Sequence, residues 1–206
     1  MTKVKICGLK EPEHVKVAVK ASVDAIGFVF ANSHRQISLQ HAEQLAVLIP
    51  PTILKIGVFV NASKAELENT AKTLNLDYVQ LHGEESPQFI QNLNIPTIKA
   101  FSIRTKEDIE KASKYDVDYY LFDAPGIDYQ GGSGQIFNWN LLEDVQIPRE
   151  KIILAGGLKV ENVREAIQQV APFMVDVSSG VEKEKRKDEH LMTTFVDAVR
   201  DRRDEK

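Results

Sequence analysis

The sequence contains a single cysteine, Cys7, among its 206 residues. An internal disulfide is therefore excluded, and the chain is compatible with a reducing compartment. Long apolar runs are also missing: a run such as residues 25–31 is far shorter than the roughly 20 residues that a membrane-spanning helix needs. Because no apolar signal core follows the N-terminal lysines either, we expect a cytoplasmic protein with no membrane partner.

An excess of one charge is likewise absent. The 26 Lys and Arg residues nearly balance 30 Asp and Glu residues, and the net charge is −4. This balance gives no reason to expect nucleic acid as a partner. The His and Cys residues lack the spacing of metal ligands, so we expect no metal. Since no linker or low-complexity segment divides the chain, we expect one domain over 1–206, with a charged tail at about 201–206.

A repeated alternation of apolar segments is what the sequence does contain. Eight short β-rich segments alternate with helix-like segments, and their ends fall roughly 20 to 30 residues apart. The β-rich segments are 4–7, 24–30, 54–60, 78–81, 97–101, 119–123, 151–155 and 174–178. Eight such units in about 200 residues predict a single parallel (β/α)₈ TIM barrel. The main alternative, a doubly wound open sheet, is disfavoured because no Gly-x-Gly-x-x-Gly follows the first segment.

Two residues at segment ends could carry acid–base chemistry, because barrels place their active sites at the carboxyl ends of the strands. Cys7 closes the first segment, and Lys5, two residues earlier, should share its face and favour the thiolate. A buried, inert cysteine is an equally consistent interpretation. Asp123 closes the sixth segment, although Asp is also common as a turn or cap residue. Together they form a plausible base–acid pair.

Glycine-rich turns follow the last three β-rich segments. They are Gly131-Gly132-Ser133-Gly134, Ala155-Gly156-Gly157 and Ser178-Ser179-Gly180. A single turn of this kind favours a structural role. The last two turns, however, fall where barrels often bind phosphate, because glycine lets backbone N–H groups approach an anion closely. We therefore expect Gly156, Gly157, Ser178, Ser179 and Gly180 to bind the phosphate of a phosphorylated substrate.

Three further polar residues are ambiguous on their own. Arg35 could be a surface charge, and His82 a core or turn histidine. Asp176 lies inside an apolar segment, so it either points into the barrel mouth or needs a partner when buried.

Eight motifs occur in a characteristic order from residue 3 to about 188. They are Lys5-Ile6-Cys7-Gly8-Leu9, Gly27-Phe28-Val29-Phe30 with Ser33 and Arg35, Gly57-Val58-Phe59-Val60-Asn61, Val79-Gln80-Leu81-His82-Gly83-Glu84-Glu85, Leu121-Phe122-Asp123, Gly131-Gly132-Ser133-Gly134, Ala155-Gly156-Gly157-Leu158 and Asp176-Val177-Ser178-Ser179-Gly180-Val181-Glu182. As an ordered set, they resemble the phosphoribosylanthranilate isomerase family of tryptophan biosynthesis.

This resemblance implies a (β/α)₈ barrel that catalyses an Amadori rearrangement of a phosphosugar without a cofactor. By similarity, Asp123 is the general acid that opens the furanose ring, and Cys7 is the general base at C2. Arg35 would hold the anthranilate carboxylate, and we assign His82 and Asp176 to substrate binding as well. Relatives occur as monomers and as homodimers.

One segment departs from the pattern of that family. After Glu182 the family usually has a Pro-Gly-x-Lys-Asp segment, whereas here residues 183–186 contain neither proline nor glycine. We expect an altered loop beside the phosphate. Two alternatives stay open: another phosphosugar-binding barrel enzyme such as indole-glycerol-phosphate synthase, which should have catalytic lysines at strand ends, and a non-catalytic phosphosugar-binding barrel.

Overall fold

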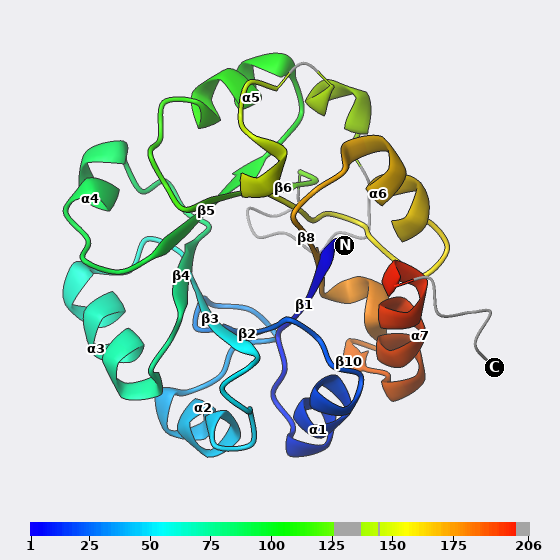
Figure 1. Cartoon of the computed structure of the whole chain (residues 1–206). Helices are drawn as coiled ribbons and strands as arrows, with labels where there is room; N and C mark the ends of the chain where they lie inside the picture. The colour runs from blue at the N-terminus through cyan, green and yellow to red at the C-terminus, as the bar shows by residue number, and fades with distance from the viewer. Residues whose placement is uncertain (126–136, 144, 201–206) are drawn as a thin grey trace.

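Eight parallel strands form a closed barrel in the computed structural model, which describes residues 1–125, 137–143 and 145–200 (Figure 1). The strands are β1 (Lys3–Cys7), β2 (Ala25–Val29), β3 (Leu54–Phe59), β4 (Tyr78–Leu81), β5 (Thr97–Ser102), β6 (Tyr119–Asp123), β7 (Ile152–Leu154) and β8 (Met174–Val177). They follow one another around the barrel in the order of the sequence. The predicted (β/α)₈ barrel is confirmed, and no strand end differs from its prediction by more than one residue.

Helices surround the barrel. They are α1 (Pro12–Lys20), α2 (Leu39–Ala46), α3 (Lys64–Leu74), α4 (Pro87–Gln91), α5 (Lys106–Ala112), α6 (Val163–Val170) and α7 (Glu189–Arg200). Between β6 and β7 the described chain forms two short 3₁₀ turns, η1 (Trp139–Leu142) and η2 (Arg149–Lys151). Within the described ranges, none of the helices has the length and apolar character needed to cross a membrane.

Serine side chains cap the first turns of three of these helices. Ser38 Oγ accepts the N–H of His41 at 3.2 Å, and Ser63 and Ser86 cap α3 and α4 in the same way. Each cap satisfies a backbone donor that the first turn of a helix would otherwise leave unpaired. The caps therefore fix where each loop at the carboxyl end of a strand gives way to its helix.

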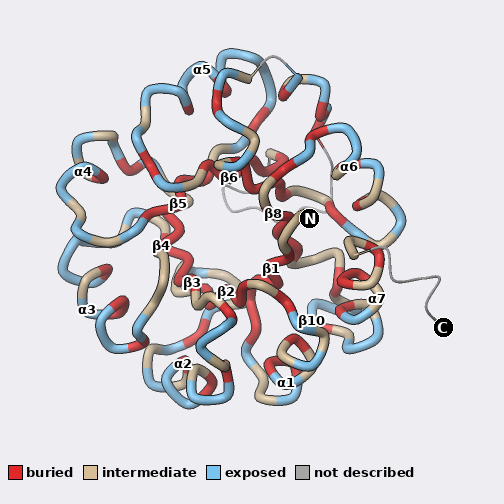
Figure 2. Tube along the Cα trace, in the orientation of Figure 1, coloured by how far each residue is buried: buried red, intermediate tan, exposed pale blue. Residues whose placement is uncertain are grey.

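The barrel closes between β1 and β8. In this pairing Lys5 stands beside Asp176 and Ile6 beside Val177. Because successive side chains point to opposite faces of a strand, Lys5 and Asp176 both point into the barrel. A small apolar cluster that includes Ile56, Ile98 and Leu121 fills the interior, and a larger one packs the outer face of the strands against the helices. Figure 2 shows this buried layer as a ring along the strands.

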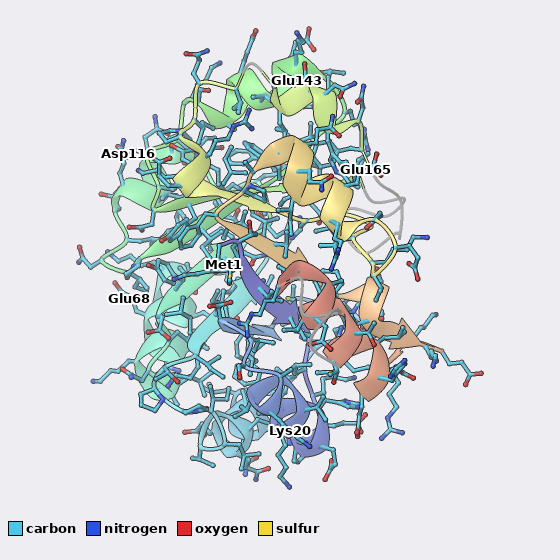
Figure 3. All side chains as sticks on the ribbon, turned by 45° about the vertical axis from the view of Figure 1, so that its right-hand side comes forward. Met1, Lys20, Glu68, Asp116, Glu143 and Glu165 are labelled. Atoms are coloured by element: carbon cyan, nitrogen blue, oxygen red, sulfur yellow. The ribbon has the colours of Figure 1, made fainter. Side chains whose placement is uncertain are left out.

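The outer surface is polar. Lys20, Asp116, Glu143 and Glu165 are exposed and project from the outside of the molecule (Figure 3). Helix α7 packs against α1 and α6, so the ring of helices closes where the barrel closes. The polar groups that remain buried are accordingly concentrated in and around the barrel.

Candidate active site

A cavity lies at the carboxyl ends of the strands. Its lining includes the predicted residues Cys7, Arg35, His82, Asp123, Gly156, Gly157, Asp176, Ser178 and Ser179. Of the predicted site residues, Gly180 alone does not line this cavity: it lies in the 3₁₀ turn η3 (Ser179–Val181), close to the carbonyl of Leu158. The motif 131–134 and the tail 201–206 lie outside the described residues. Residues far apart in the sequence thus share one site.

Cys7 ends β1 with its thiol in the cavity and is only 7% exposed. Gly27 on the neighbouring strand β2 makes room for it, because a Cβ at Gly27 would lie 2.7 Å from Cys7 Sγ. Ser178 Oγ donates a 3.0 Å hydrogen bond to the Cys7 carbonyl. The end of β1 is therefore fixed to the turn after β8, and the thiol is held at the junction of the two.

Lys5 favours the thiolate of Cys7, as expected, but burial of the thiol has the larger effect. Burial raises the pKa of the Cys7 thiol, and the charges of Lys5 and Lys187 lower it by less. The loss of hydration disfavours the thiolate more strongly than the two nearby cations stabilise it. Cys7 is thus a thiol in the free protein at neutral pH, and Lys5 limits how far its pKa rises.

Asp123 ends β6 and is 6% exposed. Burial raises the pKa of its carboxyl to about 7, and the negative charge of Asp176 adds to this. The N–H of Ala124 and the charge of Lys5 oppose the rise. A carboxyl with this pKa is protonated in a substantial fraction of molecules at neutral pH, which is what a general acid requires.

Asp176 shares a buried ion pair with Lys5. Lys5 Nζ lies 2.7 Å from Asp176 Oδ2 and 2.8 Å from Gln80 Oε1. Burial lowers the pKa of Lys5, but its interactions with Asp176 and Cys7 outweigh burial and raise it, so Lys5 is charged. Asp176 Oδ1 is buried without a hydrogen-bond partner among the described residues. Both alternatives for Asp176 therefore hold, since it has a buried partner and also presents a free oxygen to the cavity.

His82 follows β4, and its ring faces Asp123. His82 Nε2 lies 3.6 Å from Asp123 Oδ2 and has no hydrogen-bond partner in the described chain. Burial, together with the charges of Lys99 and Lys5, lowers the pKa of His82 to about 4, although Glu85 opposes the change. The ring is therefore neutral at physiological pH.

Arg35 reaches the cavity from the loop after β2 and is held by Glu182. Its Nε and Nη2 each donate a 2.8 Å hydrogen bond to the Glu182 carboxylate in a bidentate pair. Lys187 Nζ contacts the same carboxylate at 2.6 Å. Burial raises the pKa of Glu182, but Arg35 and Lys187 outweigh it and hold the pKa at about 2. The guanidinium thus has a fixed orientation at the rim of the cavity.

The altered segment after Glu182 forms a tight hairpin of β9 (Glu182–Lys183) and β10 (Arg186–Lys187). Glu184 and Lys185 connect its strands with φ of 50° and 63°. Two successive positive φ values are the geometry of a hairpin turn that favours Asn-Gly. The turn therefore forms without glycine, at the expense of backbone strain, and it still brings Lys187 within 2.9 Å of the Ser178 carbonyl.

The turns after β7 and β8 form one end of the cavity. Gly156 has φ of 82°, and a Cβ there would collide with the backbone of Ala124 after β6. Only glycine fits such a position without displacing its neighbour. Gly157, Ser178 and Ser179 line the cavity beside it. Small residues at this end suit a phosphate.

Several site residues were not predicted. Gln80 and Glu182 contact Lys5 and Arg35 through hydrogen bonds that join distant parts of the chain, and Lys187 contacts Ser178, nine positions away. Strand alternation could have identified Gln80, which lies two residues before His82. No local pattern links Glu182 to Arg35, because 147 positions separate them.

A closed parallel barrel with a protonatable carboxyl and a thiol in one cavity at the carboxyl ends of its strands is the arrangement of a (β/α)₈-barrel enzyme. Comparison with known proteins identifies the family of enzymes. The family model for N-(5'phosphoribosyl)anthranilate (PRA) isomerase matches residues 4–198. The chain belongs to this family and is an isomerase.

Relatives match over nearly their whole length. The N-(5'-phosphoribosyl)anthranilate isomerase of Bacillus mycoides is 48% identical over 195 residues, which cover 94% of this chain and 96% of the relative. The isomerase of Listeria innocua is 45% identical over 193 residues, covering 94% of this chain and 95% of the relative.

Solved structures agree with the fold. The phosphoribosyl anthranilate isomerase of Thermotoga maritima superimposes with a TM-score of 0.90 at 38% identity and covers 98% of this chain and 100% of that chain. A phosphoribosyl anthranilate isomerase in complex with reduced 1-(o-carboxyphenylamino)-1-deoxyribulose 5-phosphate gives 0.86 at 36% identity, with the same coverage.

Proposed function

We propose that this chain converts N-(5-phosphoribosyl)anthranilate to 1-(2-carboxyphenylamino)-1-deoxyribulose 5-phosphate by an Amadori rearrangement in tryptophan biosynthesis. The observation that carries the proposal is the pairing of Asp123, whose pKa is raised to about 7, with the Cys7 thiol in one cavity. The relatives named for this activity and the solved complex with a reduced product analogue support the choice of substrate.

Asp123 acts first, as the general acid. Its protonated carboxyl gives a proton to the furanose ring oxygen while the C1–O bond breaks. The lone pair of the anthranilate nitrogen forms a C1=N double bond, which leaves an open-chain, positively charged Schiff base and an ionised Asp123. Burial supports this role because it keeps a proton on the carboxyl near neutral pH.

Cys7 acts second, as the general base. Its thiolate removes the proton from C2, the C2–H electrons form a C1=C2 double bond, and the C=N electrons return to nitrogen. The resulting enolamine becomes the ketone when C1 gains a proton and the C2 hydroxyl loses one. No redox partner or cofactor enters this sequence of proton transfers.

The productive protonation state is a minor one in the free protein. It requires protonated Asp123 and ionised Cys7, whereas burial raises the pKa of the Cys7 thiol above its ordinary value. Lys5 counters this effect, and the cationic Schiff base formed in the first step favours a thiolate further. Lys5 therefore supports catalysis by increasing the fraction of Cys7 that is ionised.

The two anionic ends of the substrate are assigned to different residues of the cavity lining. We assign the anthranilate carboxylate to Arg35, whose guanidinium is oriented by Glu182. The phosphate is assigned to Gly156, Gly157, Ser178, Ser179 and the backbone of Gly180. The unpaired oxygen of Asp176 and the unpaired Nε2 of His82 are suited to the sugar hydroxyls between them.

The two alternatives lack such support. No lysine is among the described residues that line the cavity, whereas an indole-glycerol-phosphate synthase should present catalytic lysines there. A non-catalytic phosphosugar-binding barrel has no need for an acid and a thiol beside the phosphate turns. Because Cys7 must stay reduced to act as a base, we place the reaction in the cytoplasm.

The test is a continuous assay in which phosphoribosylanthranilate is generated in situ and its loss of fluorescence is followed. Wild type should accelerate the loss, and Cys7→Ser and Asp123→Asn should each lower turnover by about 100-fold or more. Circular dichroism establishes that each variant is folded. Near-wild-type turnover in both variants would refute the assigned roles, and no wild-type activity above the blank would refute the reaction.

A further inference from the structure

Another buried ion pair lies outside the cavity. Lys99 on β5 and Glu85 in the turn after β4 are 3.1 Å apart, and each side chain is only 3% exposed. Neither residue lines the cavity. A buried ion pair costs desolvation energy that is recovered only when further hydrogen bonds satisfy both groups. The destinations of these hydrogen bonds therefore indicate what the pair does.

Lys99 binds the backbone on both sides of His82. Its Nζ donates to the Leu81 carbonyl at 3.2 Å and to the Gly83 carbonyl at 2.7 Å. Lys99 points away from the barrel interior, since the interior apolar cluster contains its strand neighbours on either side, Ile98 and Ala100. It therefore holds the turn from behind the barrel wall.

Glu85 holds the same turn through its carboxylate. Its carboxylate accepts the N–H of Gly83 at 3.0 Å and the N–H of Asn61, in the loop after β3, at 2.8 Å. The peptide groups next to His82 are thus fixed to β5 and to the neighbouring loop. The backbone of the turn that carries His82 therefore cannot shift without breaking buried, charge-assisted hydrogen bonds.

Four charged or titratable groups lie around the His82 ring. They are Lys99 from β5, Glu85 from its own turn, Lys5 from β1 and Asp123 from β6. The two lysines disfavour a charged imidazole, and Glu85 favours it by less. A neutral ring 3.6 Å from the Asp123 carboxyl forms no ion pair with it. An imidazolium at that distance would stabilise the Asp123 carboxylate and promote loss of its proton.

We propose that Lys99 and Glu85 are positioning residues for the general acid: they hold residues 81–85 so that a neutral His82 ring faces Asp123. The inference rests on the proposed role of Asp123 as the acid. Without the charge of Lys99, His82 is protonated more readily and pairs with Asp123. Asp123 then ionises at lower pH, and less of it is available to protonate the ring oxygen of the substrate.

The first measurement is the titration of the His82 ring by NMR in wild type and in Lys99→Met, with the signal assigned among the five histidines by its loss in His82→Asn. In Lys99→Met we expect the pKa of His82 to rise from about 4 toward the pH range in which Asp123 titrates. The matched control is Lys111→Met, which removes a lysine 66% exposed on α5 and paired with Asp108 at the surface. This control should leave the titration of His82 and the activity unchanged.

The second measurement is the pH dependence of kcat/KM. The limb of the profile that Asp123 controls should move to lower pH in Lys99→Met. In the Lys99→Met/His82→Asn variant it should coincide with the limb of His82→Asn alone, since the effect acts through the ring. An unchanged His82 titration with an equal loss of kcat at every pH would mean a purely structural role and would overturn the proposal.

A second variant allows the test to be made if Lys99→Met fails to fold. Where Lys99→Met alone does not fold, Lys99→Met/Glu85→Leu removes both charges together, which proteins often tolerate. The pKa of His82 should again rise, because the charge of Lys99 affects this pKa more than the charge of Glu85 does. Full activity of Asp123→Asn would refute the role of the acid, whereas the NMR titration would still decide whether Lys99 controls His82.

Discussion

Lys5 Nζ lies 2.7 Å from Asp176 Oδ2 inside the barrel, although 171 positions separate the two residues. They become neighbours only because β1 and β8 close the sheet. Lys5 is fully buried and Asp176 is 8% exposed, so each charge depends on the other. The pair therefore joins barrel closure to the electrostatics of the site.

Removal of one partner should cost more than removal of both. Lys5→Met leaves the Asp176 carboxylate buried beside Gln80, and we expect it to lower the free energy of unfolding by about 3–5 kcal/mol. Lys5→Met/Asp176→Leu should recover most of this loss in urea denaturation. Equal destabilisation of the single and double variants would contradict this account.

The same double variant separates stability from catalysis. Because Lys5 lowers the pKa of Cys7 by more than Asp176 raises it, loss of both charges should raise the pH at which the thiol ionises. Cys7 is the only cysteine in the chain, so the pH dependence of alkylation by iodoacetamide reports this ionisation directly. The double variant should be stable, alkylated only at higher pH, and poorly active.

The pH dependence of kcat/KM in wild type should show two limbs. One is expected near pH 7, where Asp123 titrates, and the other at alkaline pH, where Cys7 titrates. Because the two groups share one cavity, the measured values belong to the pair. Residual activity of Asp123→Asn should lack the limb near pH 7. Persistence of that limb in the variant would assign it to another group.

Asp123 should also make the protein less stable at alkaline pH. Its folded-state pKa of about 7 is above its value in the unfolded chain, so the folded state binds the extra proton between about pH 4 and pH 7. Its stabilising contribution is therefore fully present below pH 4 and is lost as pH rises through 7. Asp123→Asn should exceed wild type in free energy of unfolding by a few kcal/mol at pH 8, with a much smaller difference at pH 5, in urea titrations at both pH values.

The sequence predicted the barrel well and the contacts between strands poorly. Strands such as Tyr119–Asp123 are short, apolar and bounded by turn residues, and these local signals also place Cys7 and Asp123 at strand ends. The Lys5–Asp176 and Arg35–Glu182 pairs depend on how distant segments meet in the closed barrel. The net pKa shift of Cys7 could not be predicted either, because it depends on how completely the folded chain removes the thiol from water.

Arg35 should determine affinity for the carboxylate end of the substrate. Arg35→Lys keeps a positive charge for Glu182 but loses the planar bidentate geometry. We expect KM to rise about 10- to 100-fold, with a smaller change in kcat, since each lost charged hydrogen bond is worth about 1.5–3 kcal/mol. A phosphoribosyl-aniline substrate, which lacks the carboxylate, should bind both proteins alike. An equal loss of affinity for both substrates would mean that Arg35 acts on the shape of the cavity instead.

The β9–β10 hairpin offers a stabilising substitution beside the site. Lys185 has φ of 63°, a conformation that costs roughly 1 kcal/mol for a residue with a side chain and is readily adopted by glycine. Lys185→Gly should therefore raise the free energy of unfolding by about 1 kcal/mol and Tm by about 2–4 °C in thermal denaturation. Lys183→Gly is the matched control: it removes a lysine from strand β9 of the same hairpin, where positive φ is not required, so it should lower Tm. A fall in Tm for both variants would show that the turn is not strained. Since neither side chain lines the cavity, kcat of both variants should remain close to that of wild type.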